Sequence, residues 1–347
     1  MPQVLSLLRR AALALGLTLA AFGAAADCGG PSLLDRLDPA ARADLAAAVA
    51  ATPHAEGILW SARRGPARIL LAGTLHLPDP RHRATLLALA PALRDADLVL
   101  LETTPQEEGA MARAVAVNPD LALALEGPVL SDRLDAAAWT VVAAAAQARG
   151  IRPADAARFR PWLLMMALSA PPCAAIPGRG GLDRMVLQAA LAEGVAVAAL
   201  EPWDTLFRLL GEGDEALQIE MLKLSLLDEG PAQELLVAMR EGYFAGRVAE
   251  VWELSRLAAR FRPEGLGHPD PQAFYRMEEA LLDRRNAAWL AVIEEAARAN
   301  PRLVVAAGAA HLPGEAGLLR LLEARGWTVE PLDRATCCQG FWTSQGH

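Results

Sequence analysis

The chain has 347 residues and a formal net charge of -8, with 53% hydrophobic and 21% charged residues. An acidic chain with a single lysine, Lys223, is a poor partner for nucleic acid or for an anionic membrane surface, so we expect neither. The apolar fraction is large enough to bury a sizeable core.

The first 26 residues have the pattern of a secretory signal peptide. Arg9 and Arg10 precede an uncharged, Ala- and Leu-rich stretch, residues 11–26, which ends in three alanines before Asp27. This stretch is shorter than the roughly 20 apolar residues that a membrane crossing needs. We therefore expect an exported protein, periplasmic or secreted, without stable membrane insertion after cleavage.

Export makes the four cysteines interpretable. Cys28, Cys173, Cys337 and Cys338 are an even number in an oxidising compartment, which predicts two disulfides. Three pairings are open. The adjacent cysteines would close an awkward ring, so we expect one of them to pair with Cys28 and the other with Cys173. No Cys-x-x-Cys motif is present, which argues against a zinc ribbon or a thioredoxin-like site.

The N-terminal part of the mature chain predicts one helix followed by strands. Residues 32–52 have a helical pattern with Ser32 or Asp38 as the cap. Two strand-like runs then form a predicted hairpin, residues 57–62 and 67–72. A helix over residues 85–94 and an aliphatic strand over residues 96–102 follow.

The remaining pattern alternates helices and strands around helical segments. We expect a strand over 195–200, a long helix over 273–299, and a final strand, helix and strand from residue 303 to residue 332. The sequence therefore predicts an α/β fold with a central mixed, largely parallel sheet and helices on both faces. It would be one domain, residues 27–347, with an all-helical insertion at about 107–180 and 204–261.

Two strands end in the same motif. Residues 69–78 read ILLAGTLHLP and residues 303–313 read LVVAAGAAHLP, so His76 and His311 each stand three residues after a glycine. Parallel strands place their carboxyl ends at one edge of a sheet, where sites form. A lone Gly-x-x-His is more often structural. A second copy in matched context, among six histidines, favours a shared metal or acid–base site.

Two glutamates follow strands at the same predicted edge. Glu102 ends the strand after the first histidine motif, and Glu201 ends the strand over 195–200; either could instead be a solvated loop acid. Two imidazoles and a carboxylate suit Zn²⁺, Mn²⁺ or Co²⁺. A metal-bound water could attack a carbonyl, with Glu201 or Glu102 as general base, which predicts hydrolysis of a peptide, amide or ester. The absence of HExxH, Gly-x-Ser-x-Gly and a Gly-rich phosphate loop argues against other hydrolases and nucleotide chemistry.

Six segments resemble the TraB/GumN family, which includes the Tiki proteases. They are GTLHLP, LLE, GLD at 181–183, LEP at 200–202, RN at 285–286 and GAAHLPGEAGLLRLLEARGWTV, and the likeness spans about residues 30–335. The resemblance implies an α/β fold related to erythromycin-esterase-like and ChaN-like proteins. It implies His76, His311 and Glu102 as metal ligands, and Arg285 and Asn286 as orienting or substrate-binding residues. The Tiki members are metal-dependent proteases, so the resemblance implies a metalloprotease.

Other functions fit the same residues. The histidines could grip a metal or haem in a non-catalytic binding protein, or the chain could be a scaffold in envelope polysaccharide export. Binding without turnover would favour these alternatives. If the histidines only cap strands, His76→Ala and His311→Ala would leave every function intact.

Overall fold

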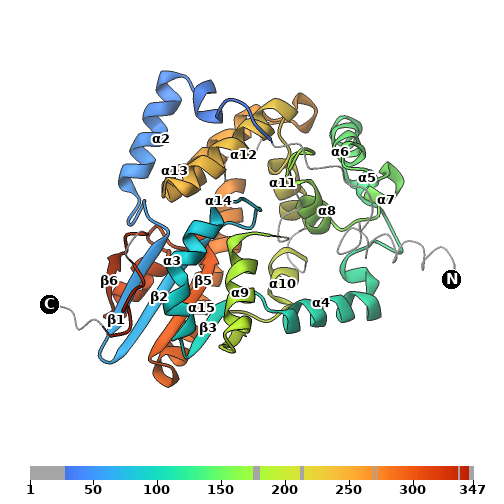
Figure 1. Ribbon diagram of the computed structural model, residues 1–347. Helices are drawn as coiled ribbons and strands as arrows, with labels where there is room; N and C mark the ends of the chain where they lie inside the picture. Colours follow the sequence, from blue (N-terminus) through green and yellow to red (C-terminus); the bar gives the residue numbers. More distant parts are fainter. Residues whose placement is uncertain are drawn as a thin grey trace.

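The structure, a computed structural model, describes residues 28–174, 180–211, 215–268, 270, 272–334 and 337–343. The predicted signal peptide, residues 1–26, lies outside the described residues. The core of the fold is one six-stranded sheet in the order β4-β3-β5-β2-β1-β6 (Figure 1). Its strands are β1 Leu59–Arg64, β2 Ala67–Thr74, β3 Leu98–Leu101, β4 Ala196–Ala199, β5 Arg302–Gly308 and β6 Thr328–Pro331.

The sheet is mixed and largely parallel, as predicted. Strands β4, β3, β5 and β2 run parallel to one another, while β1 is antiparallel to both β2 and β6. The predicted hairpin is therefore β1 and β2. The two strands with the histidine motif, β2 and β5, are direct neighbours, and Thr74 pairs with Gly308.

Both faces of the sheet are covered by helices, which confirms the predicted α/β fold. Successive side chains of a strand point to opposite faces, and β2 is buried on both, so it reads as a continuous apolar run. Leu70 and Ala72 pack in a cluster with helices α3 (His82–Arg94) and α9 (Leu182–Ala192). Ile69 and Leu71 pack in another with α15 (Arg284–Ala299) and α16 (Leu318–Ala324).

Further helices pack beyond the sheet. Helix α2 (Pro39–Ala51) begins at Asp38, whose carboxylate accepts a 2.8 Å hydrogen bond from the Ala41 amide, as a cap does. Figure 1 shows α5 to α8 gathered at the end of the molecule away from β1 and β6. The other helices are α4 Pro105–Val117, α5 Leu130–Arg133, α6 Ala136–Ala148, α7 Pro153–Ala156, α8 Pro161–Leu168, α10 Thr205–Gly211, α11 Glu215–Leu224, α12 Glu229–Phe244, α13 Val248–Ala258 and α14 Ala273–Glu278.

These helices have cores of their own. One buried cluster joins α4 through α8 with α10 and α11, and another joins α2 with α12 and α13. The long helix predicted over 273–299 is present as α14, a π-helical segment η5 (Glu279–Asp283) and α15. Short 3-10 turns are η1 Leu33–Arg36, η2 Pro119–Leu121, η3 Ala259–Phe261, η4 Glu264–Leu266 and η6 Ala309–His311. Among the described residues, no helix combines the length and the apolar composition needed to cross a membrane.

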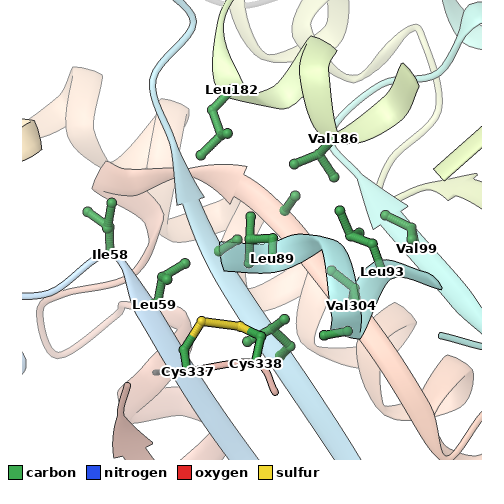
Figure 2. Packing of buried hydrophobic residues seen from close by; sticks show 14 of the residues in the cluster. Ile58, Leu59, Leu89, Leu93, Val99, Leu182, Val186, Val304, Cys337 and Cys338 are labelled. Carbon is green, nitrogen blue, oxygen red and sulfur yellow. A yellow bond between two sulfur atoms is a disulfide. The ribbon is translucent and has the colours of Figure 1, made fainter. Parts of the chain in front are cut away.

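The predicted disulfide pairing was wrong. Cys28 pairs with Cys173, and the adjacent Cys337 and Cys338 pair with each other, with Cα atoms 3.7 Å apart. Cys337 and Cys338 are buried in a core cluster that does not include Cys28, so they lie within reach of each other and not of the N-terminal cysteine. Figure 2 shows the Cys337–Cys338 bond beside Leu59 of this cluster.

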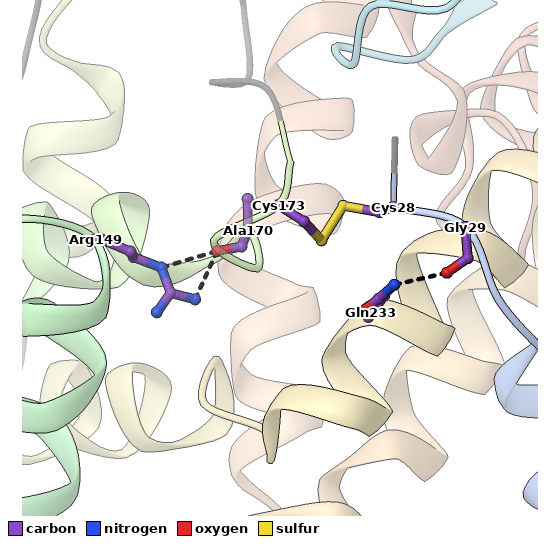
Figure 3. Close-up of a disulfide and its surroundings, with 6 residues drawn as sticks. All are labelled: Cys28, Gly29, Arg149, Ala170, Cys173 and Gln233. Carbon is purple, nitrogen blue, oxygen red and sulfur yellow. Dashed lines mark hydrogen bonds between the residues drawn. A yellow bond between two sulfur atoms is a disulfide. The ribbon is translucent and has the colours of Figure 1, made fainter. Parts of the chain in front are cut away.

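The Cys28–Cys173 disulfide joins two segments that hydrogen bonds also hold in place. Gln233 donates a 2.6 Å hydrogen bond to the Gly29 carbonyl beside Cys28, and Arg149 donates to the Ala170 carbonyl near Cys173 (Figure 3). The bond therefore ties the N-terminal end of the described chain to the helical segment around α8.

Candidate functional site

The carboxyl ends of four parallel strands bring the predicted site residues to one edge. His76 follows β2 by two residues, Glu102 follows β3 directly, Glu201 comes just after β4, and His311 ends the η6 turn after β5. Arg285, in the first turn of α15, reaches the same edge. His76 and His311, 235 positions apart in sequence, thus share one site because β5 inserts between β2 and β3.

Arg285 stands at the centre of this site, buried, with four partners. Its guanidinium donates to both oxygens of Glu201, at 2.8 and 3.0 Å, and to Glu102 Oε2 at 2.8 Å. It also donates to the Leu281 carbonyl and, at 3.2 Å, to His311 Nε2. Burial would lower the pKa of Arg285, but its contacts with Glu201 and Glu102 outweigh burial and raise it. The site therefore contains a permanent positive charge.

His311 is buried and held at both ring nitrogens. Its Nδ1 lies 2.6 Å from Asn286 Oδ1, while Asn286 Nδ2 donates to the Ala316 carbonyl at 2.9 Å, so the amide oxygen is the acceptor. Nδ1 consequently carries the proton, and Nε2 accepts from Arg285. Burial is the main cause that lowers the pKa of His311 to about 4, with Arg285 also lowering it and Glu102 opposing. His311 is neutral at neutral pH.

His76 is the exposed member of the pair, with 45% of its side chain accessible. Nδ1 lies 3.1 Å from Asp183 Oδ1 and Nε2 lies 3.7 Å from Glu102 Oε1. Burial alone would lower the pKa of His76, but the contact with Asp183 and the charges of Glu102 and Asp183 outweigh it and raise the pKa to about 9. At neutral pH His76 is therefore protonated and positively charged, whereas His311 is neutral.

Glu102 lies between His76 and Arg285. Oε1 accepts a 2.6 Å hydrogen bond from the Gly308 amide, and Oε2 accepts from Arg285. Burial would raise the pKa of Glu102, but the basic side chains of His311, His76 and Arg285, with the Gly308 amide, lower it to about 2. This carboxylate is ionised at neutral pH, as a metal ligand must be.

Gly308 leaves a space between these groups. A Cβ atom added to Gly308 would lie 3.1 Å from Glu102 Oε1, 3.6 Å from His76 Nε2 and 3.6 Å from His311 Cδ2. Glu102 Oε1 and His76 Nε2 therefore both face one small space above Gly308. His311 presents a carbon there, because its Nε2 is turned to Arg285.

The predicted metal ligands thus lie together but are not equally available. Within the described parts of the chain, no group of three His, Cys, Asp or Glu side chains is arranged to hold a metal ion. His76 would have to lose its proton before it and Glu102 could contact one cation, and His311 would have to exchange its contact with Arg285 for one with the metal. The three-ligand set stays a prediction.

The structure adds two residues to those predicted from sequence. Asp183 contacts His76, and Trp289 donates a 2.8 Å hydrogen bond from Nε1 to Glu201 while its ring lies 4.3 Å from that of His311. Trp289 is one helical turn after Arg285, a spacing that could have indicated it. Asp183 lies in the GLD segment, which carried the resemblance but was assigned no role.

Comparison with known proteins identifies one family. The sequence model of the TraB/PrgY/gumN family matches residues 58–331, which include every site residue described above. A search of curated proteins gave no match.

Proposed function

The chain belongs to the TraB/PrgY/gumN family, and from that membership and the site geometry we propose that it is an exported metal-dependent hydrolase of peptide, amide or ester bonds. The observation that supports the proposal is the space above Gly308, to which Glu102 Oε1 and His76 Nε2 are both directed. Export, to the periplasm or the medium, is supported by the Cys28–Cys173 disulfide, which is typical of an oxidising compartment.

The proposed cofactor is Mn²⁺, Co²⁺ or Zn²⁺, held by His76 and Glu102, with His311 as the further predicted ligand. When bound, such an ion lowers the pKa of a bound water and polarises a carbonyl. His76 must lose its proton to bind the ion, so binding releases a proton at neutral pH.

The protein's own residues arrange this site. We assign to Arg285 the orientation of Glu102 and Glu201, because it donates to both carboxylates. Asn286 orients His311 by accepting from Nδ1. Glu201 is bound by Arg285 and Trp289, and Glu102 is strongly acidic, so we assign Glu102 to metal binding and Glu201 to the support of Arg285.

One observation favours the second candidate, a non-catalytic protein that binds metal or haem or serves as an envelope scaffold. His311, Glu102 and Glu201 already satisfy one another through Arg285, so this cluster is complete without a bound ligand. A cluster of this kind also has a structural use, because it ties the ends of β3, β4 and β5 to helix α15.

The deciding experiment measures metal in the purified mature protein by mass spectrometry after reconstitution with Mn²⁺, Co²⁺ and Zn²⁺. We expect a stoichiometric ion in the wild type, its loss in the His76→Ala/His311→Ala double mutant with folding unchanged, and metal-dependent cleavage in a peptide and ester screen. Metal without turnover would support the binding protein. No metal in any preparation would overturn the metallohydrolase.

A glycine variant tests the space itself. Gly308→Ala places a methyl group between Glu102 and His76 at a backbone conformation, φ -49°, that alanine tolerates, so we expect loss of metal and activity with a folded protein. Gly109→Ala, in α4 and outside the site, is the matched control and should keep both. Full metal binding by Gly308→Ala would place the ion elsewhere.

A further inference from the structure

The start of helix α9 lies directly against the backbone of the His76 loop. The Leu182 amide donates a 3.1 Å hydrogen bond to the Leu75 carbonyl. A Cβ on Gly181 would come within 2.5 Å of His76 Cα and would also overlap the Leu75 carbonyl oxygen. Only glycine allows this approach, which fixes the first turn of α9 relative to His76.

Asp183, in that first turn, contacts the His76 ring. Its Oδ1 forms an ion pair with His76, 3.1 Å from Nδ1, and has no hydrogen bond from any other described residue or any closely aligned one from His76 itself. The contact leaves His76 Nε2 as the nitrogen that faces Glu102 and the space above Gly308. His76 Nδ1 thus faces Asp183, and His76 Nε2 faces the site.

The backbone on both sides of His76 is held independently of Asp183. The Tyr243 hydroxyl donates a 2.9 Å hydrogen bond to the Gly73 carbonyl, and His82 Nε2 lies 2.8 Å from the Leu77 carbonyl. Tyr243 and His82 also contact each other edge to face. Since Tyr243 and His82 hold the backbone of the loop, the contact of Asp183 with His76 bears on the orientation of the imidazole ring and not on the position of the loop.

We propose that Asp183 is a positioning residue for His76. The Asp183 carboxylate accepts from the His76 Nδ1–H and so holds His76 Nε2 toward the space above Gly308. A histidine that binds a metal through one nitrogen commonly donates its other N–H to a carboxylate, which fixes the tautomer and raises affinity. The effect on metal affinity rests on the proposed function. The orientation of the ring does not.

The test uses Asp183→Ala and Asp183→Asn in the full mature chain, with Glu193→Ala as matched control. Glu193 is at the other end of α9 in an exposed pair with Arg94, so its loss leaves the site intact. Isothermal titration with Co²⁺ is expected to show binding about 10- to 100-fold weaker for Asp183→Ala. Asp183→Asn, which keeps an acceptor oxygen of the same shape, should recover part of this loss, and Glu193→Ala should match the wild type.

A second measurement is independent of metal and turnover. In metal-free protein labelled with ¹⁵N-histidine, the His76 Nδ1–H signal, identified by its absence in His76→Gln, is expected in the wild type and in Glu193→Ala. It should be lost to exchange with water in Asp183→Ala. Circular dichroism checks that each variant is folded. If Asp183→Ala does not fold, the same signal is measured in Asp183→Asn instead.

The outcomes separate this inference from the proposed function. If the wild type binds no Co²⁺ but Asp183→Ala loses the His76 signal, the metallohydrolase fails and the positioning role stands. If the wild type binds Co²⁺, and the Asp183 variants bind it within about twofold of the wild type and keep the signal, the positioning role is overturned while the proposed function stands.

Discussion

Arg285 determines the charge balance of the site at the level of single residues. Its buried guanidinium contacts two carboxylates and a neutral histidine. Trp289 donates a further hydrogen bond to one of these carboxylates, Glu201. Removing one partner of such a buried pair typically costs about 3–5 kcal/mol because the other charge is left unpaired. The two motif histidines differ in protonation because burial lowers the pKa of His311, whereas Asp183 and Glu102 raise that of His76.

The histidines give the metal-free protein an optimum of stability near neutral pH. The pKa of His76 is raised from 6.5 to about 9, so its stabilising contribution is complete below pH 6.5 and is lost as pH rises through 9. His311, with its pKa lowered to about 4, stabilises the fold when neutral, and this is lost as pH falls from 6.5 to 4. Glu102 loses its contribution at still lower pH, from 4.5 toward 2.

Thermal unfolding in the presence of a chelator, from about pH 3 to about pH 10, measures this dependence. We expect the melting temperature to fall on both sides of neutrality in the wild type, and His76→Gln to flatten the alkaline side only. Leu191→Ala, at an exposed and uncharged position of α9, should leave both sides unchanged. If the melting temperature of His76→Gln fell at alkaline pH as much as that of the wild type, His76 would not be the cause of this fall.

Among the contacts between secondary-structure elements, the one between the start of α9 and the β2–α3 loop affects the site most directly. Gly181→Ala introduces a methyl group against backbone atoms of Leu75 and His76, which cannot move aside as a flexible side chain can. We expect a loss of about 1–3 kcal/mol in the free energy of unfolding, measured with urea. Faster amide exchange at residues 74–78 should accompany it.

A second substitution in α9 serves as the control. Leu191 is 52% exposed near the end of the same helix, so Leu191→Ala should change the free energy of unfolding by less than about 0.5 kcal/mol. If Gly181→Ala were as stable as Leu191→Ala, the helix start would not be docked on the His76 loop as described.

The Cys28–Cys173 disulfide acts on the scale of the whole molecule. It closes a loop with a sequence separation of 145, and a loop of this size restricts the unfolded chain strongly. We expect Cys28→Ser/Cys173→Ser to lower the free energy of unfolding by about 2–4 kcal/mol in denaturant titrations.

The second disulfide provides the comparison. Cys337 and Cys338 are adjacent in sequence, so their bond removes almost no loop entropy from the unfolded chain. Cys337→Ser/Cys338→Ser should therefore be less destabilising than the other double mutant. The reverse order would mean that burial of the Cys337–Cys338 pair in the core outweighs chain entropy.

The sequence by itself determined the fold class and the edge of the sheet at which the predicted site residues lie. Strands β2 and β5 were predictable because both are buried on two faces and read as apolar runs that stop at glycine. Glu102 and Glu201 were predictable because each follows such a run directly. Local patterns of this kind depend on neighbours in the chain, which the sequence contains.

Only the tertiary structure decided the partners of these residues. The placement of β5 between β2 and β3, the contact of Asp183 with His76, and the turn of His311 Nε2 toward Arg285 all depend on atoms distant in sequence. The predicted cysteine pairing was wrong for the same reason, because the burial of Cys337 and Cys338 in the core depends on long-range packing. Long-range packing, which fixes such contacts, leaves no periodic signal in a single sequence.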